Sequence, residues 1–347
     1  MKKQKSILLI FTGGTVSMGE NPDTKALEPL DHKQVLAYIP ELQMMDVNIA
    51  SVSFNPLVDS SEIKPTTWIK LTETIAQNYD LYDGFVILHG TDTMAYSASA
   101  LSFMLENLSK PVIFTGSQLP VRVLRSDAKE NLLTAVEMAT AEHNNLPMVP
   151  EVSLFFEDEL IRGNRSTKKN TENFDAFASY NYPVLAKSGV HIKYFPSEIH
   201  YGKNTTLIAH KQLDTNIAIL KLFPGIQEKF VNAVFSTENL RAVIIETFGT
   251  GNAPKDEWLY RCLKRANEAG TVLLNISQCR AGSVEMGRYE TSLNLLKAGV
   301  ISGYDMTLEA AVTKLMVLLG ENDRAETVKE LLRYPIRGEM TVPENVL

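Results

Sequence analysis

The chain has 347 residues, 44% of them hydrophobic, and a formal net charge of −7 at pH 7. This length allows two domains with separate cores, and the acidic balance argues against a nucleic-acid partner, because such proteins usually present a basic face. Two cysteines, Cys262 and Cys279, are too few for a secreted disulfide framework, and no apolar run reaches the length of a membrane helix. We therefore expect a cytoplasmic protein with reduced thiols that contacts neither nucleic acid nor membrane.

Apolar runs with the length of strands alternate along the chain with amphipathic segments. The first run is too short for a signal-peptide core and leads at once into a glycine turn. The expected strands lie at 7–11, 85–88, 112–114, 152–156, 217–220, 242–245 and 272–274. Their nearly continuous apolar character is typical of parallel strands that are covered on both faces.

Helices are predicted between these strands, at 65–79, 96–107, 127–142, 256–268 and 308–319. Gly270 and Gly320 stand where helix C-caps are expected. This alternation predicts an α/β protein of two domains, each with a mainly parallel sheet flanked by helices. A weakly patterned stretch is expected to connect them, so we predict an N-terminal catalytic domain at 1–192, a linker at 193–212 and a smaller C-terminal α/β domain at 213–347.

Two short segments carry the clearest chemical signal. Thr12-Gly13-Gly14-Thr15 follows the first expected strand, and His89-Gly90-Thr91-Asp92-Thr93 follows the second. In open α/β sheets, ligands bind at the carboxyl ends of the strands. A threonine becomes a nucleophile only when a base removes its proton. Two threonine loops, one with an aspartate, therefore indicate a nucleophile and its activating partner.

These segments resemble the bacterial-type L-asparaginase family, and within it the cytoplasmic type I branch. The likeness extends over nearly the whole chain, through Asp59-Ser60-Ser61, Gly116-Ser117-Gln118, Arg162-Gly163-Asn164-Arg165-Ser166-Thr167-Lys168, Gly251-Asn252-Ala253-Pro254 and Asp305-Met306-Thr307. A glycine-rich turn alone is a weak signal, because such turns also occur in phosphate sites. The motifs at 12–15, 89–93 and 162–168, in this order along one chain, are a far more specific signal.

The resemblance implies hydrolysis of L-asparagine to L-aspartate and ammonia without a cofactor or metal. A clamp on both α-substituents of the substrate would make L-glutamine the slower substrate. It implies that Thr15 attacks the amide carbon, through a β-acyl-threonine ester in the route we favour, although direct attack by water stays open. Thr91 and Lys168 are expected to transfer protons, while Asp92 holds Lys168 or pairs with the substrate ammonium. Without the resemblance, the residues favour a helix cap for Thr15 and a solvated lysine in a basic loop for Lys168.

The remaining site residues are expected to bind the substrate. The resemblance implies that Asp59, Ser60 and Ser61 grip the α-carboxylate, with Asp59 itself orienting the loop or contacting the ammonium. From the residues alone, this segment also reads as a turn before a helix. The resemblance places the Ser117 backbone beside the leaving amide. It gives His89 no part in proton transfer, so we expect a structural hydrogen bond there.

One departure from the family pattern concerns the activation of Thr15. Relatives commonly carry a tyrosine in the loop after the first motif, whereas residues 16–29 contain none and Leu27 stands near that place. Tyr289 matches a tyrosine that some type I relatives supply from a neighbouring subunit, although it also reads as an ordinary half-buried side chain. Asn252 matches a second cross-subunit position. The resemblance therefore implies a homodimer or homotetramer with composite active sites.

Two other functions stay in view. A tRNA-dependent amidotransferase subunit shares this catalytic core but carries an extra N-terminal domain, for which we expect no room because Thr12 lies so close to the start of the sequence. An amino-acid sensor that lost its chemistry is expected to lack Thr15, Thr91 or Lys168, and all three are present. Release of ammonia from asparagine separates these functions.

Overall fold

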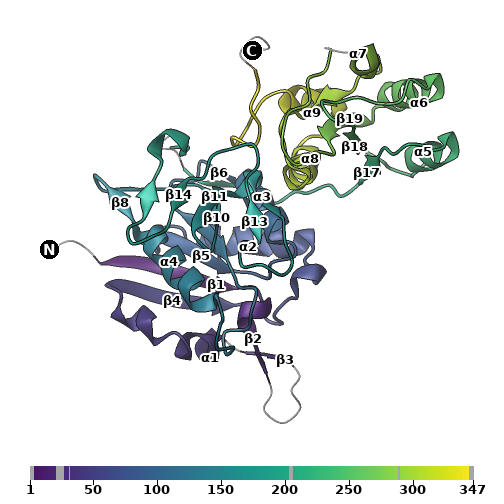
Figure 1. Cartoon of the computed structure of the whole chain (residues 1–347). Coiled ribbons are helices and arrows are strands. Elements are labelled where there is room, and N and C mark those ends of the chain that lie inside the picture. The colour runs from purple at the N-terminus through teal and green to yellow at the C-terminus, as the bar shows by residue number, and fades with distance from the viewer. Residues whose placement is uncertain (1–3, 21–26, 31, 203–205, 288–289, 344–347) are drawn as a thin grey trace. The chain divides into compact units, whose positions relative to one another are not determined.

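The chain forms two compact units in a computed structural model, residues 1–209 and 210–347. The model describes residues 4–20, 27–30, 32–202, 206–287 and 290–343. Each unit is built around its own sheet (Figure 1). The connection predicted at 193–212 includes two short strands, β15 (Lys193–Tyr194) and β16 (Ile208–Ala209), that both pair with strands of the first unit. The exact limits of the domains stay a prediction.

The first unit contains an eight-stranded sheet in the order β15-β14-β11-β10-β7-β5-β1-β4. Its strands, in chain order, are β1 (Lys5–Phe11), β4 (Val47–Ser53), β5 (Gly84–Leu88), β7 (Val112–Thr115), β10 (Val152–Phe156), β11 (Glu159–Arg162), β14 (Ala186–Lys187) and β15 (Lys193–Tyr194). The five strands from β10 to β4 are parallel, and β11, β14 and β15 continue the sheet in antiparallel pairs. The carboxyl ends of four neighbouring parallel strands, β4, β1, β5 and β7, therefore share one edge.

Alternate residues of the parallel strands face opposite layers of helices. Ile7, Leu9 and Val86 belong to one buried cluster with Leu132 and Val136 of helix α4 (Ala128–Thr140). Figure 1 shows α4 across this face, with α2 (Pro65–Asn78) and α3 (Met94–Met104) on the other side. Because both faces are covered, these strands are apolar along their whole length, as the sequence predicts.

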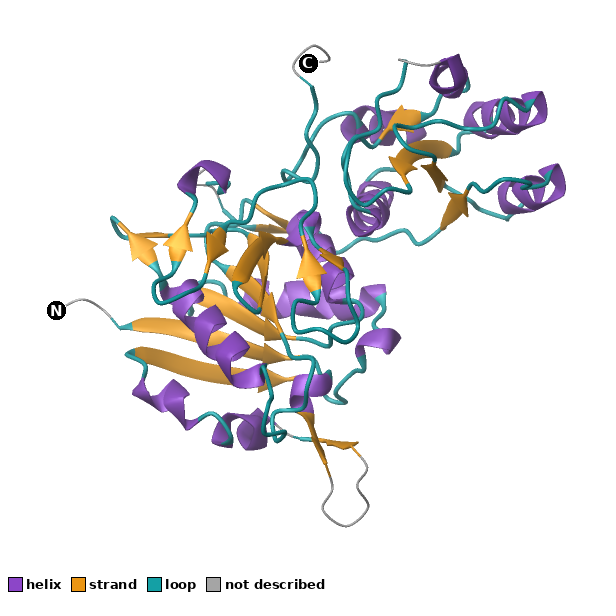
Figure 2. Cartoon of the chain, viewed as in Figure 1, coloured by secondary structure: helices purple, strands orange, loops and turns teal. Residues whose placement is uncertain are grey.

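The second unit contains a parallel four-stranded sheet, also with helices on both faces (Figure 2). Its strands are β17 (Ile217–Lys221), β18 (Ala242–Thr247), β19 (Val272–Ser277) and β20 (Ile301–Ser302). Its helices are α5 (Glu228–Phe235), α6 (Glu257–Glu268), α7 (Glu290–Lys297), α8 (Leu308–Glu321) and α9 (Ala325–Leu332). The fold is thus the predicted α/β class, with a parallel-rich sheet in each unit.

Shorter elements complete the description. The paired strands are β2 (Met18–Glu20) with β3 (Leu27–Pro29), β6 (Leu105–Glu106) with β16 (Ile208–Ala209), β8 (Glu142–His143) with β9 (Leu146–Pro147), and β12 (Thr167–Lys168) with β13 (Phe177–Ala178). The short helices are α1 (His32–Ala37) and the 3-10 turns η1 (Thr15–Ser17), η2 (Pro40–Met44), η3 (Ser60–Glu62), η4 (Gly163–Arg165) and η5 (Pro196–Glu198). None of the helices in the described part of the chain has the length and apolar character needed to span a membrane.

The prediction of a C-cap at Gly320 is wrong. Helix α8 continues through this glycine to Glu321. A Cβ atom on Gly320 would lie only 2.2 Å from the carbonyl oxygen of Gln212. The absence of a side chain therefore serves a close backbone contact and does not end the helix. Gly270, in contrast, follows Ala269, the C-cap residue of α6, and has a φ of 94°, as the left-handed end of a helix requires.

Candidate active site

Four loops with predicted site residues leave the same edge of the first sheet. They follow β1, β4, β5 and β7, which are neighbours in the parallel part of that sheet. The backbone N–H and the hydroxyl of Thr12 both donate to the Leu88 carbonyl, at 3.0 Å each, so the first two loops start side by side. The sheet order thus gathers segments that lie far apart in the sequence.

Gly14 and Gly90 allow these loops to touch. Gly14 has a φ of 87°, and a Cβ there would lie 2.3 Å from the Gly90 Cα atom. A Cβ on Gly90 would in turn lie 2.5 Å from the hydroxyl oxygen of Ser60. Three loops therefore meet at Gly90, where no side chain fits. They are the loop after β1 with Thr15 (the threonine loop), the loop after β5 with Asp92 (the aspartate loop) and the loop after β4 with Ser60 (the serine loop).

Replacement of Gly90 by alanine tests this packing. We expect Gly90→Ala to lower enzymatic activity at least tenfold and to destabilise the fold by about 1–3 kcal/mol, because the serine loop must move away from the added methyl group. Gly189→Ala is the matched control, since its nearest contact would be an ordinary 3.8 Å. Thermal unfolding and steady-state kinetics measure both effects. Unchanged kinetics in Gly90→Ala would contradict the packing.

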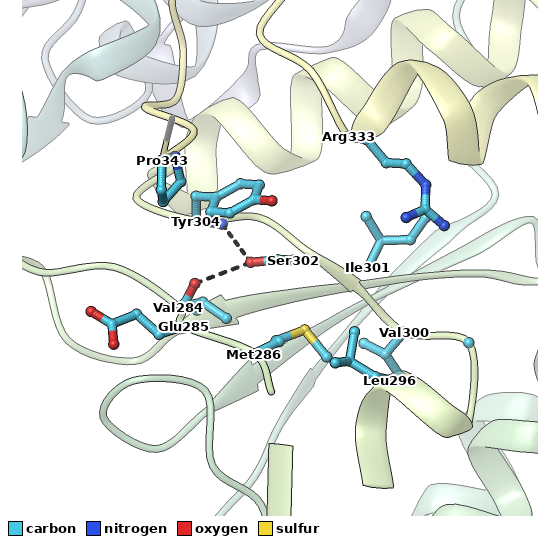
Figure 3. Close-up of a pocket in the computed structure, with 11 residues that line it drawn as sticks. Val284, Glu285, Met286, Leu296, Val300, Ile301, Ser302, Tyr304, Arg333 and Pro343 are labelled. Atoms are coloured by element: carbon cyan, nitrogen blue, oxygen red, sulfur yellow. Dashed lines mark hydrogen bonds between the residues drawn. The ribbon is translucent and has the colours of Figure 1, made fainter. Parts of the chain in front are cut away.

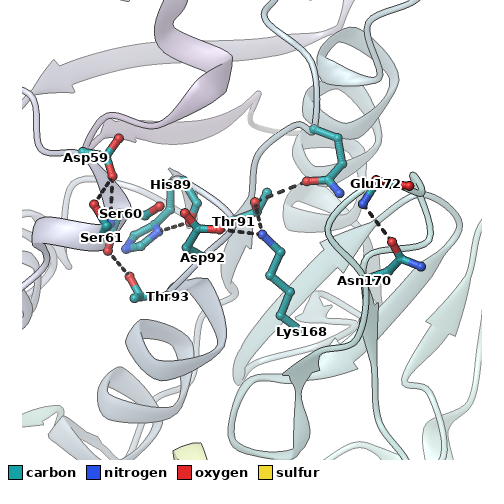
Figure 4. Close-up of polar contacts among 12 residues, drawn as sticks. Asp59, Ser60, Ser61, His89, Thr91, Asp92, Thr93, Lys168, Asn170 and Glu172 are labelled. Atoms are coloured by element: carbon teal, nitrogen blue, oxygen red, sulfur yellow. Dashed lines mark hydrogen bonds and ion pairs between the residues drawn. The ribbon is translucent and has the colours of Figure 1, made fainter.

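Lys168, Thr91 and Asp92 form a connected polar cluster (Figure 4). The Lys168 ammonium donates to the Thr91 hydroxyl at 2.8 Å and to an Asp92 carboxylate oxygen at 2.7 Å. The Lys168 side chain is 16% exposed, whereas Asp92 is 62% exposed and open to solvent. Lys168 is thus held at Thr91 and is not a freely solvated lysine. Asp92 contacts Lys168, which is one of its two expected roles, and keeps exposed carboxylate surface.

The position of Lys168 depends on a short antiparallel pair. Lys168 lies in β12 opposite Phe177 of β13, and the Lys169 N–H donates to the Ala176 carbonyl at 2.8 Å. Just before this strand, the Ser166 hydroxyl donates to the Gly163 carbonyl at 2.7 Å and closes the η4 turn. The backbone on both sides of Lys168 is therefore fixed.

The serine loop is organised by Asp59. The Asp59 carboxylate accepts the Ser61 hydroxyl at 2.6 Å and the Ser61 N–H at 2.8 Å, and these hydrogen bonds lower the pKa of Asp59. The Thr93 hydroxyl donates to the Ser60 carbonyl at 2.6 Å and ties this loop to the aspartate loop. Asp59 therefore orients the loop, in agreement with one of its two expected roles.

The loop after β7 carries Ser117, and the expected place of its backbone beside the leaving amide stays a prediction. The Ser117 side chain is buried, and its hydroxyl donates to the Leu119 carbonyl at 2.6 Å within the same loop. The next residue reaches the cluster: the Thr91 hydroxyl lies 3.3 Å from the side-chain oxygen of Gln118. Gln118 belongs to the motif Gly116-Ser117-Gln118, and no role was predicted for it from the sequence. Its contact with Thr91 depends on β7 lying beside β5, which no local pattern in the sequence specifies.

His89 is a buried structural residue. Its two ring nitrogens lie 2.7 Å from the Gly90 carbonyl and 2.8 Å from the Ser97 hydroxyl, which also accepts the Trp68 indole N–H at 2.9 Å. Burial lowers the pKa of His89 to about 4, so its ring is neutral near pH 7. These contacts bear out the structural hydrogen bond expected from the sequence.

Other predicted residues are less defined. Thr15 starts η1 and is partly buried, and no hydrogen bond from its hydroxyl to a base is present in the described part of the chain. The backbone after it forms the β2–β3 hairpin. Tyr289 lies outside the described residues. Asn252 belongs to the second unit, where its backbone exchanges hydrogen bonds of 2.8 and 2.9 Å with Phe248. The group that activates Thr15 is thus not among these contacts.

Neither cysteine forms a disulfide, as predicted: Cys262 is buried and Cys279 is exposed. Within the described ranges, no three His, Cys, Asp or Glu side chains come together as metal ligands.

A separate cavity of about 540 Å³ lies in the second unit (Figure 3). Its described lining, which includes Met286, Tyr304 and Arg333, contains none of the predicted site residues.

Comparisons with known proteins show the family of this chain. Residues 6–200 match the family model "Asparaginase, N-terminal", and residues 216–332 match "Glutaminase/Asparaginase C-terminal domain". The chain is 43% identical to L-asparaginase 1 of Escherichia coli (strain K12), over 98% of this chain and 99% of that protein.

Two solved structures extend this likeness to the fold. L-asparaginase I from Vibrio cholerae matches with a TM-score of 0.89 and 42% identity, over 98% of this chain and 100% of that one. The thermostable L-asparaginase from Thermococcus kodakarensis matches with a TM-score of 0.89 and 30% identity, over 97% of this chain and 100% of that one. The chain belongs to the asparaginase family and contains both the N-terminal and the C-terminal domain of that family.

Proposed function

We propose that this chain hydrolyses L-asparagine to L-aspartate and ammonia, and that the reaction takes place where the loops after β1, β4, β5 and β7 meet. The observation that carries this proposal is the contact of Lys168 with both Thr91 and Asp92, next to the glycine-lined approach of the Thr15 loop. Membership of the asparaginase family supports the same reaction. The reaction needs no cofactor, because attack, proton transfer and hydrolysis all use side chains and water.

Thr15 is the proposed nucleophile. Its hydroxyl oxygen bonds to the side-chain amide carbon of the substrate, and the carbonyl oxygen gains negative charge in the tetrahedral intermediate. In this proposal, backbone N–H groups of the Gly90–Thr91 loop stabilise that charge. The C–N bond then breaks, which leaves a β-acyl-threonine ester. Attack by water on this ester releases L-aspartate and returns the proton to Thr15.

Thr91 and Lys168 carry the protons of this cycle. One proton leaves the attacking hydroxyl, and one reaches the departing nitrogen so that it leaves as ammonia. A lysine whose nitrogen lies within hydrogen-bonding distance of a hydroxyl is placed for such a transfer. Asp92 holds Lys168 in place, and its exposed carboxylate surface is available to the α-ammonium of the substrate.

The proposed grip on the α-carboxylate uses Ser60, Ser61 and the backbone of their loop, which Asp59 orients. A substrate clamped at both α-substituents presents its amide at a fixed distance from Thr15. L-Glutamine has one more methylene group, which moves its amide carbon away from the nucleophile, and small misplacements are costly in rate. L-Asparagine is therefore the better substrate.

Ammonia release from the purified chain tests the function. We expect kcat/KM for L-asparagine to exceed that for L-glutamine at least tenfold, with one aspartate formed for each ammonia. Equal kcat/KM values would contradict the clamp. The absence of ammonia from both amides would contradict the enzyme and favour a sensor that only binds the amino acid.

We further propose that the chain forms a cytoplasmic homodimer or homotetramer with composite sites. Its small-molecule partner is the substrate, L-asparagine. In this arrangement Asn252 and Tyr289 of a neighbouring chain complete each site, and Tyr289 polarises Thr15 in place of the missing loop tyrosine. Support comes from the family resemblance of these two positions and from the lack of a tyrosine in residues 16–29. A two-fold interface places two such sites at one contact.

Mixing two inactive variants tests the composite site. A dimer of one Thr15→Val chain and one Asn252→Ala chain contains one site with both defects and one intact site. We therefore expect subunit exchange to restore up to about a quarter of wild-type activity, since half of the dimers are mixed and half of their sites are intact. If native mass spectrometry detects mixed dimers but ammonia release does not recover, Asn252 acts in its own chain or not at all.

A further inference from the structure

We propose that Gln118 is a positioning residue that sets the direction of the Thr91 hydroxyl during proton transfer. This inference rests on the proposed function and adds to it a residue to which the family resemblance gives no role. It stands on three sets of contacts: those of the Thr91 oxygen, those of the Gln118 amide and those of the Gln118 backbone.

The Thr91 oxygen has two polar neighbours with opposite requirements. The Lys168 nitrogen lies 2.8 Å away, and the Gln118 side-chain oxygen lies 3.3 Å away. An ammonium group can only donate a hydrogen bond, and an amide oxygen can only accept one. Because Thr91 has a single proton, that proton points to Gln118 and a lone pair points to Lys168.

The orientation of the Gln118 amide is fixed by a second contact. Its nitrogen donates to the backbone carbonyl of Asn173 at 3.0 Å. A carbonyl oxygen cannot face another oxygen favourably, so the flipped amide would lose this bond and present N–H groups to Thr91. The Asn173 carbonyl therefore ensures that Gln118 offers an acceptor, not a donor, to Thr91.

The backbone of Gln118 is anchored as well. The Asp127 carboxylate, at the start of α4, accepts the Gln118 N–H at 3.0 and 3.1 Å and the Leu119 N–H at 3.1 Å. The same carboxylate accepts the Asn131 side-chain amide at 3.2 Å. Gln118 is thus held at its backbone by α4 and at its amide by Asn173, which leaves its oxygen in a defined position beside Thr91.

This arrangement has a consequence for the reaction. While Lys168 carries its proton, Gln118 keeps a Thr91 lone pair directed at the ammonium. Thr91 accepts that proton as it passes its own proton to the departing nitrogen, so one O–H bond breaks as the other forms. When Lys168 is neutral, the Thr91 hydroxyl can turn from Gln118 to the amine and give it its proton, while Thr91 accepts the proton of the attacking Thr15 hydroxyl. Gln118 therefore sets the direction of the Thr91 hydroxyl while Lys168 is charged.

Gln118→Met removes the acceptor and keeps the length of the side chain. We expect kcat for L-asparagine to fall about three- to tenfold, the effect of one neutral hydrogen bond, with KM changed less than twofold. Exposed Gln43 supplies the control, since Gln43→Met should leave both constants unchanged. Wild-type kcat in Gln118→Met would overturn the proposal.

A double-mutant cycle with Thr91→Val separates this role from a structural one. If Gln118 acts through the Thr91 hydroxyl, Gln118→Met should cause no further loss of kcat in the Thr91→Val background. A full loss in that background would mean that Gln118 acts through the Asn173 contact instead, which overturns the proposal.

Thermal unfolding of the same four proteins keeps the inference testable apart from the enzyme activity. The melting temperatures should be non-additive, because either substitution removes the same hydrogen bond. Additive shifts would overturn the contact even in an inactive protein. Conversely, non-additive shifts in a wild-type chain that releases no ammonia would reject the proposed function and retain the Gln118–Thr91 contact.

Discussion

Thr15→Val is expected to abolish ammonia release from L-asparagine while the fold stays intact. Valine has nearly the shape of threonine but no hydroxyl, so the variant loses the nucleophile without a large change in packing. Loss of an activated nucleophile lowers kcat by roughly 1,000-fold or more. Steady-state kinetics measure the loss, and thermal unfolding checks the fold.

The first threonine of the same motif supplies the matched control. The Thr12 hydroxyl donates to the Leu88 carbonyl, which also accepts the Thr12 N–H at 3.0 Å. Thr12→Val therefore leaves that carbonyl with a partner, and we expect the variant to keep most of its activity. Wild-type-like turnover by Thr15→Val, or an equal loss in both variants, would reject Thr15 as the nucleophile.

The second large effect concerns the proton-transfer pair. Lys168→Met and Thr91→Val should each lower kcat by about 100-fold or more, the range typical of lost general acid–base catalysis. The double variant should lose little beyond either single variant, because the two groups lie 2.8 Å apart and transfer the same proton. Measurement of kcat for all four proteins gives the coupling directly.

Lys169 provides the control for charge in this loop. It pairs with Asp175, and such exposed ion pairs contribute little to stability or to a neighbouring site. Lys169→Met should therefore keep near-wild-type kinetics. Penalties that add in the Lys168 and Thr91 double variant would instead mean that the two residues act in separate steps.

The parallel core of both units could be predicted from the sequence for a simple reason. Strands that are covered on both faces must be apolar throughout, and β5 and β18 are buried along their whole length. Edge strand β4 lacks this signal, because it pairs with β1 alone and mixes Asn48, Ser51 and Ser53 with apolar residues. The predicted C-cap at Gly320 was wrong because glycine is favoured both at a helix end and at a close backbone contact, here with Gln212.

The site shows the same division. The motif residues Thr91, Asp92 and Lys168 were predicted and lie in contact. The bond between Thr91 and Gln118 was not predicted, because it depends on β7 lying next to β5, which no local pattern in the sequence specifies. The burial of the Ser117 hydroxyl in its own loop depends likewise on the turn geometry after β7.

The central claim is that Thr15 attacks the amide carbon of L-asparagine, and acid quenching during turnover tests it most directly. Peptide mass spectrometry of the quenched wild-type enzyme should find an aspartyl group on the peptide that contains Thr15. This aspartyl group should be absent once the substrate is exhausted. An acyl group on Thr91 would contradict the assignment of the nucleophile. Continued turnover with no acylated peptide at any quench time would contradict the covalent route and indicate direct attack by water.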